Sequence, residues 1–215
     1  MSLPRYIAIE GPIGAGKTSL SAKLAEDLQA RLVLEKLDDN PFLAEFYQDR
    51  RKHALKTQIL FLISRYQQQR ELIQHDLFSQ MIICDYLFAK DRIFASLNLS
   101  KDEQFIYEKI YSLLDAQLPK PDLVVYLQAS LDVLKKHIKK RGLDYEKHID
   151  MGYVEELSEA YNRFFFTYTA TPVLTVNVTD IDFVKNPNDY ANLVREILNT
   201  SKRGRGMTRF VGIGK

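Results

Sequence analysis

The residue types with the clearest chemical use form an eight-residue loop near the N-terminus. An apolar run over 6–10 leads into a segment that fits the pattern G-x-x-x-x-G-K-[ST], namely Gly11-Pro12-Ile13-Gly14-Ala15-Gly16-Lys17-Thr18. Its glycines let backbone N–H groups converge on phosphate oxygens, and a following helix directs its positive dipole end at the same anion. We predict a P-loop that binds ATP, with Lys17 at the β- and γ-phosphates and the Thr18 hydroxyl as a ligand of Mg²⁺.

The P-loop alone does not choose among the classes of nucleotide-hydrolysing and nucleotide-using proteins. A GTPase normally has an Asn/Thr-Lys-x-Asp element that recognises guanine, and the nearest string, Val184-Lys185-Asn186-Pro187, does not fit it. A length of 215 residues is also short for a motor ATPase. A small-molecule kinase is the best remaining class.

Two carboxylates follow short apolar runs elsewhere in the chain. Glu35 comes just after the run 31–34, and Asp85 just after the run 81–84. If these runs are parallel strands, both carboxylates lie at the edge of the sheet that holds Gly11, because ligands gather at the carboxyl ends of such strands. Asp85 has the position of a Walker-B-like acid that binds Mg²⁺ directly or through water. From the residues alone, a solvated surface glutamate is the better interpretation of Glu35.

Strands alternate with helices along the whole chain. This alternation predicts an α/β fold with a five-stranded parallel sheet that helices cover on both faces. The predicted strands are 6–10, 31–34, 81–84, 123–127 and 173–178, and the predicted helices are 19–29, 41–47, 53–76, 89–97, 102–118, 131–140, 153–168 and 189–198.

Composition is typical of one globular domain in the cytoplasm. Hydrophobic residues make up 46% of the chain, and no apolar run approaches the ~20 residues of a membrane span. The N-terminus lacks the features of a signal peptide, and the single cysteine, Cys84, cannot form an internal disulfide. The four histidines show no metal-ligand spacing. We therefore expect neither a membrane partner nor a histidine metal site.

Charge divides the chain into residues 1–200 and 201–215. The last fifteen residues have five cations, no acid and four of the nine glycines; subtracting these five charges from the net +2 leaves −3 on the body. A mildly acidic body argues against a nucleic-acid polymer as partner. We predict one kinase domain over 1–200 and a flexible basic tail over 201–215, with an anion-binding arm as the alternative for the tail.

Beyond the P-loop, the chain resembles the deoxyribonucleoside kinase family from about residue 5 to about residue 198. Together the matching strings are far more specific than the P-loop. They are Asp39-Asn40-Pro41-Phe42, Cys84-Asp85-Tyr86, Asp91-Arg92-Ile93-Phe94-Ala95, Leu118-Pro119-Lys120-Pro121 and Lys140-Arg141-Gly142. The resemblance implies the P-loop kinase fold with a short lid, and transfer of the γ-phosphate of ATP to the 5′-hydroxyl of a deoxyribonucleoside in nucleotide salvage.

The resemblance also implies roles for residues on the acceptor side. Glu35 matches the general base near the 5′-hydroxyl, a role that suits a carboxylate within hydrogen-bond reach. Tyr47 matches the residue that holds the sugar 3′-hydroxyl. Gln58 matches the residue that recognises the nucleobase, and Arg65, two helical turns later on the same face, lies near the base or the catalytic carboxylates. Asp91 matches an acid that helps to recognise the base.

The cations around the P-loop depart from the family pattern. Tyr86 stands where the family has an arginine, and Arg65 is the candidate to compensate for the lost charge. We place Tyr86 in the acceptor pocket as a wall of the base, although aromatic residues of this kind are more often part of the core. In the lid, Arg141 matches one arginine of an Arg-Gly-Arg pattern, while the second is Leu143 and an earlier lid arginine is His137. Lys139 and Lys140 are the candidate replacements.

Two further positions follow from the resemblance. Glu146 matches a lid acid that contacts the sugar 3′-hydroxyl. The segment 179–183, with Asp182 and Phe183, matches the loop that contacts the adenine of ATP, and a plain turn between strand and helix is equally compatible with it.

Two other functions stay open at this stage. A thymidylate or other nucleoside-monophosphate kinase would favour an arginine next to Asp85 and would need no general base, so Tyr86 and Glu35 argue against it. A non-catalytic nucleotide-binding subunit would not need Lys17, Thr18, Glu35 and Asp85 intact. The strings resemble bacterial deoxyadenosine and deoxyguanosine kinases most, which favours purine deoxynucleosides, with deoxycytidine as a further candidate. Family members are commonly homodimers through helices like 53–76 and 102–118, so we expect a dimer.

Overall fold

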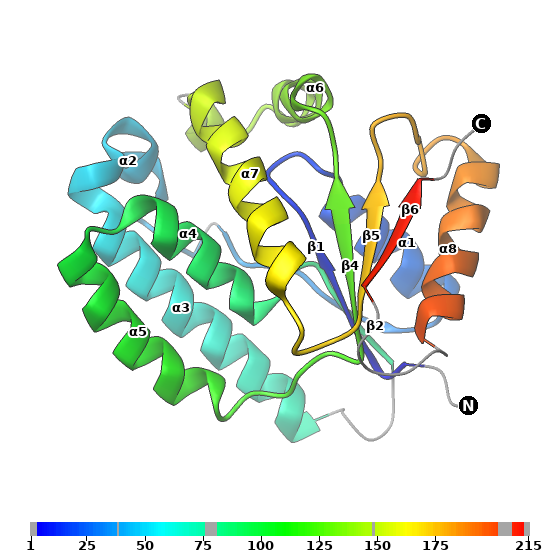
Figure 1. Cartoon of the computed structure of the whole chain (residues 1–215), viewed down its shortest axis with the longest axis horizontal. Coiled ribbons are helices and arrows are strands. Elements are labelled where there is room, and N and C mark those ends of the chain that lie inside the picture. Colours follow the sequence, from blue (N-terminus) through cyan, green and yellow to red (C-terminus); the bar gives the residue numbers. More distant parts are fainter. Residues whose placement is uncertain (1–3, 38, 76–80, 148, 202–207, 213–215) are drawn as a thin grey trace.

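The structure is a computed structural model, and it describes residues 4–37, 39–75, 81–147, 149–201 and 208–212. The predicted strands form one parallel sheet (Figure 1). These strands are β1 (Tyr6–Glu10), β2 (Arg31–Val33), β3 (Ile82–Cys84), β4 (Leu123–Gln128) and β5 (Val173–Asn177). With a sixth strand their order is β2-β3-β1-β4-β5-β6, and every neighbouring pair is parallel. The α/β prediction and its five parallel strands are confirmed.

The sixth strand, β6 (Thr208–Gly212), corrects part of the prediction for the tail. We expected a flexible appendage over 201–215, but β6 pairs along the edge of β5 from Val173↔Thr208 to Asn177↔Gly212. Thr, Phe and Val in this stretch favour strands, and the free edge of β5 offers hydrogen-bond partners. The surrounding glycines and cations concealed this pattern. Residues 202–207 and 213–215 lie outside the described residues.

Helices cover both faces of the sheet. The helices are α1 (Lys17–Asp27), α2 (Leu43–Gln48), α3 (Arg50–His75), α4 (Asp91–Asn98), α5 (Lys101–Asp115), α6 (Leu131–Arg141), α7 (Met151–Thr167) and α8 (Pro187–Ser201), with short 3₁₀ turns η1 (Phe88–Lys90) and η2 (Asp144–Glu146). Their bounds differ from the predicted ones by a few residues, except that the predicted helix 89–97 is divided into η1 and α4. Among helices in the described ranges, none is long and apolar enough to cross a membrane.

Side-chain alternation along β1 divides the core into two layers. Ile7 and Ile9 pack with α1 and α8 on one face of the sheet, whereas Tyr6 and Ala8 pack with α7 on the other. A third cluster joins α2, α3, α4, α5 and α7 away from the sheet (Figure 1). The carboxyl ends of the strands therefore lie between the helices of the two faces, and α6 lies beyond the end of β4 (Figure 1).

Candidate active site

The P-loop lies between β1 and α1 and is packed against two other segments. Gly14 (φ +87°) and Gly16 (φ +96°) have left-handed backbone that favours glycine. A Cβ on Gly14 would lie 2.8 Å from the Leu134 carbonyl oxygen in α6, and a Cβ on Gly16 would lie 2.9 Å from Cζ of Phe183. Both glycines thus allow close contact, one with the lid helix and one with the loop after β5.

The two polar residues of the P-loop face other parts of the site. Lys17 Nζ donates to the carbonyl oxygens of Gly11 (2.8 Å) and Pro12 (3.2 Å), and Thr18 Oγ1 donates to Asp85 Oδ2 (2.7 Å). Burial lowers the pKa of Lys17, and the nearby charge of Lys90 lowers it further. The adjacent oxygens of Thr18 and Asp85 suit Mg²⁺, which is commonly held by one or two protein ligands together with substrate phosphates. The described residues contain no cluster of three or more His, Cys, Asp or Glu side chains for a metal.

Glu35 is buried beside the P-loop. Its backbone N–H donates to Asp85 Oδ1 (2.7 Å), which fixes the chain at the end of β2. Its carboxylate accepts on both oxygens: Oε1 from Arg65 (Nη2 2.6 Å, Nε 2.8 Å) and Oε2 from Lys90 Nζ (2.6 Å). The side chain is 8% exposed, so the solvated-surface interpretation is wrong. Burial raises the pKa of Glu35, but Lys90 and Arg65 outweigh it and lower this pKa to about 2.

A second polar network extends from Arg65 into the helical layer. Arg65 Nη1 also pairs with Asp91 Oδ2, so this guanidinium bridges Glu35 and Asp91. Gln58 Nε2 donates to the Asp91 carbonyl oxygen (3.0 Å) and to Asp91 Oδ1, which also accepts from Tyr107 Oη (2.9 Å). Asp91 is fully buried behind Gln58 and Arg65 and does not line the cavity. It fixes the two residues that do.

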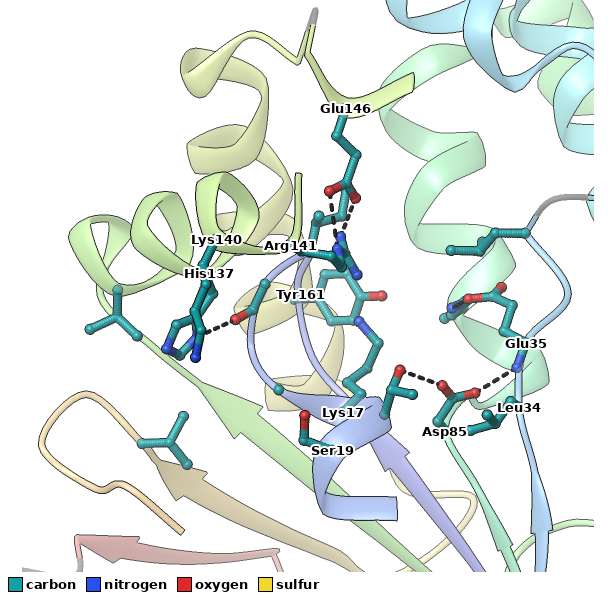
Figure 2. Close-up of a pocket in the computed structure, with 18 of the residues that line it drawn as sticks. Lys17, Ser19, Leu34, Glu35, Asp85, His137, Lys140, Arg141, Glu146 and Tyr161 are labelled. Carbon is teal, nitrogen blue, oxygen red and sulfur yellow. Dashed lines mark hydrogen bonds and ion pairs between the residues drawn. The ribbon is translucent and has the colours of Figure 1, made fainter. Parts of the chain in front are cut away.

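One cavity of about 910 Å³ connects the P-loop with this network. Its volume is within the range of small-molecule binding pockets. Figure 2 shows Lys17, Asp85 and Glu35 on one side of it, opposite Arg141 and Glu146. Most of the predicted site residues line it, namely Ile13, Gly14, Gly16, Lys17, Thr18, Glu35, Tyr47, Gln58, Arg65, Asp85, Arg141, Glu146, Asp182 and Phe183. Gly11, Pro12 and Ala15 form the P-loop backbone behind this surface.

The lid helix α6 presents one face to the cavity. Lys136, His137, Lys140 and Arg141 all line it, and His137 Nδ1 lies 2.8 Å from the Gly14 carbonyl oxygen. The i, i+4 spacing from 136 to 140 and from 137 to 141 explains this shared face. Lys139, a predicted replacement for a lid arginine, does not line the cavity, so that prediction is wrong, whereas Lys140 is on the cavity face.

The two lid residues singled out by the sequence are paired with each other. Arg141 Nε donates to Glu146 Oε2 (3.0 Å), and Arg141 Nη2 pairs with Glu146 Oε1. Glu146 is 4% exposed in its side chain and Arg141 is 39% exposed. Tyr47 lies nearby, with its ring stacked 6.4 Å from that of Tyr145. The pair therefore closes the side of the cavity next to α2.

The loop after β5 is shaped by its own side chains. Asp182 accepts from the backbone N–H groups of Val184 (3.2 Å) and Lys185 (3.0 Å). Phe183 is buried against Gly16, and its carbonyl oxygen accepts from Lys23 Nζ (3.1 Å). This loop therefore borders the P-loop end of the cavity, and Asp182 both shapes it and lines the cavity.

Tyr86 is the predicted site residue that the structure removes from the cavity. It is fully buried, packs in the cluster with Tyr6 and Ile93, and does not line the cavity. Side chains alternate after β3, so Asp85 points toward the P-loop while Tyr86 points into the core. The prediction that Tyr86 forms a wall of the acceptor pocket is wrong.

Sequence reasoning missed Lys90, Glu10 and Tyr161. Lys90 and Tyr161 line the cavity, and Glu10 is fully buried beneath the P-loop. Glu10 had a detectable signal, since it is a charged residue that ends an otherwise apolar strand. Lys90 and Tyr161 had none, because both fall in segments with ordinary helical patterns.

Comparison with known proteins agrees with this geometry. The family model described as deoxynucleoside kinase matches residues 7–201. Deoxyguanosine kinase of Bacillus subtilis is 38% identical over 202 residues, which cover 92% of this chain and 98% of that protein. Deoxyadenosine kinase of Lactobacillus acidophilus is 32% identical over 207 residues, covering 90% and 94%. A solved structure of deoxyadenosine kinase from M. mycoides with bound dATP superposes with a TM-score of 0.77 at 27% identity, covering 89% and 97%.

Proposed function

The chain belongs to the deoxynucleoside kinase family and is an ATP-dependent phosphotransferase, and on this premise we propose a purine deoxynucleoside as its preferred acceptor. Two relatives that are at least 30% identical over nearly their whole length are named for deoxyguanosine and deoxyadenosine. We further propose that this kinase acts in nucleotide salvage in the cytoplasm. A thymidylate kinase is disfavoured because the position after Asp85, where such an enzyme would favour an arginine, is a buried tyrosine.

The proposed reaction is a direct transfer between the two ends of the cavity. The 5′-oxygen of the deoxynucleoside attacks the γ-phosphorus of ATP, and the new O–P bond forms as the bond to the β–γ bridging oxygen breaks. ADP leaves with that electron pair, and the hydroxyl proton passes to the Glu35 carboxylate. Positioning and charge stabilisation dominate such a transfer, so cations on both sides of the γ-phosphate matter most.

Each side of the cavity has residues for one part of this reaction. We assign the phosphates of ATP to Lys17 and the P-loop N–H groups, and the adenine to the loop with Asp182 and Phe183. Thr18 and Asp85 would hold Mg²⁺, which neutralises charge on the phosphates when it is bound. Arg141 would exchange its ion pair with Glu146 for contact with the transferred phosphoryl group.

The acceptor is assigned to the other end. Gln58 would bind the nucleobase and is oriented by Asp91, because acceptor atoms of Asp91 fix the direction of its amide nitrogen. Tyr47 and Glu146 would hold the 3′-hydroxyl. The single observation that best supports phosphoryl transfer at this site is the buried Glu35 carboxylate. Arg65 and Lys90 hold it, and the Glu35 backbone N–H donates to Asp85, which accepts from Thr18.

Acceptor choice is tested by steady-state kinetics with saturating Mg²⁺ and ATP. The four common deoxynucleosides and the four corresponding monophosphates are compared by kcat/KM. We expect deoxyguanosine or deoxyadenosine to give the highest value and every monophosphate to be a poor acceptor. A monophosphate as the best acceptor would favour a nucleoside-monophosphate kinase, and no ATP consumption with any of them would favour a non-catalytic subunit.

We also propose a homodimer through the outer helical layer, which is the surface formed by α3 and α5. Large apolar side chains of α5 are exposed there: Phe105 by 67%, Ile106 by 52% and Leu113 by 71%. Ile63 of the neighbouring helix α3 is also 39% exposed. Large exposed apolar side chains that gather on neighbouring helices are typical of a protein interface. In Figure 1 this layer lies at the far side of the molecule from β6, so a dimer formed there leaves the open sheet edge free.

A further inference from the structure

Lys90 is a buried lysine next to the proposed base, Glu35. Its side chain is 3% exposed and lines the cavity from the end of η1. Its ammonium lies 2.6 Å from Glu35 Oε2 and 3.8 Å from Glu10 Oε1. Burial of an ammonium is unfavourable unless carboxylates or other acceptors surround it, so Lys90 is held where it is by these two acids.

Glu10 connects Lys90 to the P-loop. This carboxylate is fully buried, and each of its oxygens accepts a backbone hydrogen bond: Oε2 from Gly11 N (2.8 Å) and Oε1 from Leu87 N (2.8 Å). The Glu10 carboxylate therefore contacts the first residue of the P-loop, the segment after β3 and the Lys90 ammonium. A shift of Lys90 would disturb both Glu10 and Glu35.

The Glu35 carboxylate has a different cation on each oxygen. Arg65 occupies Oε1 and Lys90 occupies Oε2, so together they fix the rotation of the carboxylate. Arg65 is fixed in turn by Asp91, whereas Lys90 is fixed by Glu10. Lys90 is also close enough to Lys17 for its charge to lower the pKa of that residue. Its ammonium therefore lies near both the P-loop lysine and the proposed base.

We propose that Lys90 is a positioning residue for phosphoryl transfer, which fixes the Glu35 carboxylate toward the acceptor hydroxyl and couples it through Glu10 to the P-loop. This inference rests on the proposed function of Glu35. It assigns Lys90 a role that acts through another residue, so its loss should affect the chemical step more than the binding of either substrate. A purely structural ion pair would instead affect stability and both substrates alike.

The first test compares three variants by kcat, by KM for ATP and deoxyguanosine, and by thermal unfolding. Lys90→Met removes the charge and keeps the length of the side chain, Lys90→Arg keeps the charge, and Lys101→Met is a control at the exposed start of α5. We expect Lys90→Met to lower kcat by about 100-fold with each KM changed less than about threefold. Lys90→Arg should recover at least about tenfold of that loss, and Lys101→Met should match the wild type.

A double-mutant cycle tests whether Lys90 acts through Glu35. In the background Glu35→Gln, adding Lys90→Met should lower kcat by less than about threefold, because the group that Lys90 positions is already gone. The double variant also removes one positive and one negative buried charge together. If Lys90→Met alone does not fold, the same comparison is made between Lys90→Arg and the wild type in both backgrounds.

Two outcomes would overturn the proposal. One is a folded Lys90→Met variant with kcat within threefold of the wild type, or with its loss confined to KM. The other is a loss of the same size in the presence and absence of the Glu35 carboxylate. Failure of the proposed function is distinct from both, since the wild-type chain itself would then phosphorylate no deoxynucleoside.

Discussion

At the level of single residues, the proposed reaction depends on a carboxylate that is buried and charged at once. Glu35 is ionised because Arg65 and Lys90 surround it, and it is placed because its backbone N–H binds Asp85. A carboxylate with so low a pKa is a weak base in the resting enzyme. In the proposed reaction we therefore expect it to align the acceptor hydroxyl and to accept the proton late in the transfer.

The substitution Glu35→Gln keeps the size of the side chain and removes its charge and its basicity. We expect kcat to fall by about 100-fold or more, since both the alignment of the hydroxyl and the acceptance of its proton are impaired. The dissociation constant for ATP, measured by calorimetry without acceptor, should change little because the P-loop is intact. Wild-type turnover in this variant would remove Glu35 from the mechanism.

Acid pH should remove the stabilisation that Glu35 gives to the fold. Its pKa is about 2 in the folded protein against an ordinary value of 4.5, so its contribution is complete above about pH 5 and declines as the pH falls below 4.5. Between pH 6 and pH 3.5 the difference in unfolding free energy between wild type and Glu35→Gln should shrink by about 1.4 kcal/mol. Denaturant titrations at both pH values measure it, and a constant difference would contradict the low pKa.

At the scale of elements, the P-loop, the lid helix α6 and the loop after β5 are fitted to each other through glycines. Gly14 is in contact with α6 and Gly16 with Phe183, so the P-loop packs directly against both segments. Because α6 brings Lys136, His137, Lys140 and Arg141 to the cavity, the contact at Gly14 determines where these side chains lie relative to the P-loop.

The substitution Gly14→Ala should therefore impair ATP binding. The added Cβ would meet backbone of α6 at 2.8 Å in a left-handed conformation, so the P-loop or the helix must shift. We expect the affinity for ATP to fall by at least about tenfold, which corresponds to ~1.4 kcal/mol. Calorimetric titration with ATP-Mg²⁺ measures it.

Gly142→Ala is the matched control for Gly14→Ala. Gly142 is also left-handed (φ +65°), but its added Cβ would have 3.9 Å to the nearest atom, the Lys139 carbonyl oxygen. It should therefore cost stability of about 1 kcal/mol without the loss of ATP affinity. Equal affinities for ATP in the two variants would show that the contact with α6 is not what matters.

The elements were largely predictable from the sequence, and the reasons are local. Short apolar runs followed by Gly11, Glu35 and Asp85 identified the strands that bear the site. Both the apolar run and the residue that follows it can be recognised directly in the sequence. The strand β6 was not predicted, since glycines and cations around Thr208–Gly212 suggested a flexible tail. Pairing with β5 is a long-range effect that composition does not report.

The site was predictable where a residue type or a family motif marked it. Lys17, Thr18, Glu35, Gln58 and Arg65 all line one cavity, as expected. Tyr86 was assigned to the acceptor pocket and Lys90 was not identified, because the direction of each side chain depends on the turn that follows β3. That turn buries Tyr86 in the core and returns Lys90 to Glu35.

At the scale of the whole molecule, the outer helical layer is expected to be the dimer interface. Gel filtration or light scattering should give a mass of about twice the 25.0 kDa of one chain. Leu113 is 71% exposed on the apolar face of α5. Leu113→Asp should produce monomers, because the dimer would bury an unpaired charge in its interface. Phe166→Asp is the matched control, since Phe166 is 83% exposed on α7, outside this layer.

A monomeric wild-type chain would contradict the dimer, and so would a dimer that Leu113→Asp leaves intact while Phe166→Asp disrupts it. Activity gives a second measure. The cavity residues assigned to ATP, Lys17, Asp182 and Phe183, lie outside α3 and α5. A folded monomeric variant should therefore keep its KM for ATP.

Transfer of the γ-phosphate of ATP to a 5′-hydroxyl can be followed with a radioactive label. The chain is incubated with Mg²⁺, γ-³²P-labelled ATP and either deoxyadenosine or deoxyguanosine, and the products are separated by chromatography. We predict that the label appears in the deoxynucleoside 5′-monophosphate, and that no labelled nucleotide forms from 2′,5′-dideoxyadenosine, which lacks the accepting hydroxyl. Label that stays in ATP or appears only as inorganic phosphate, with both purine deoxynucleosides, would contradict the account.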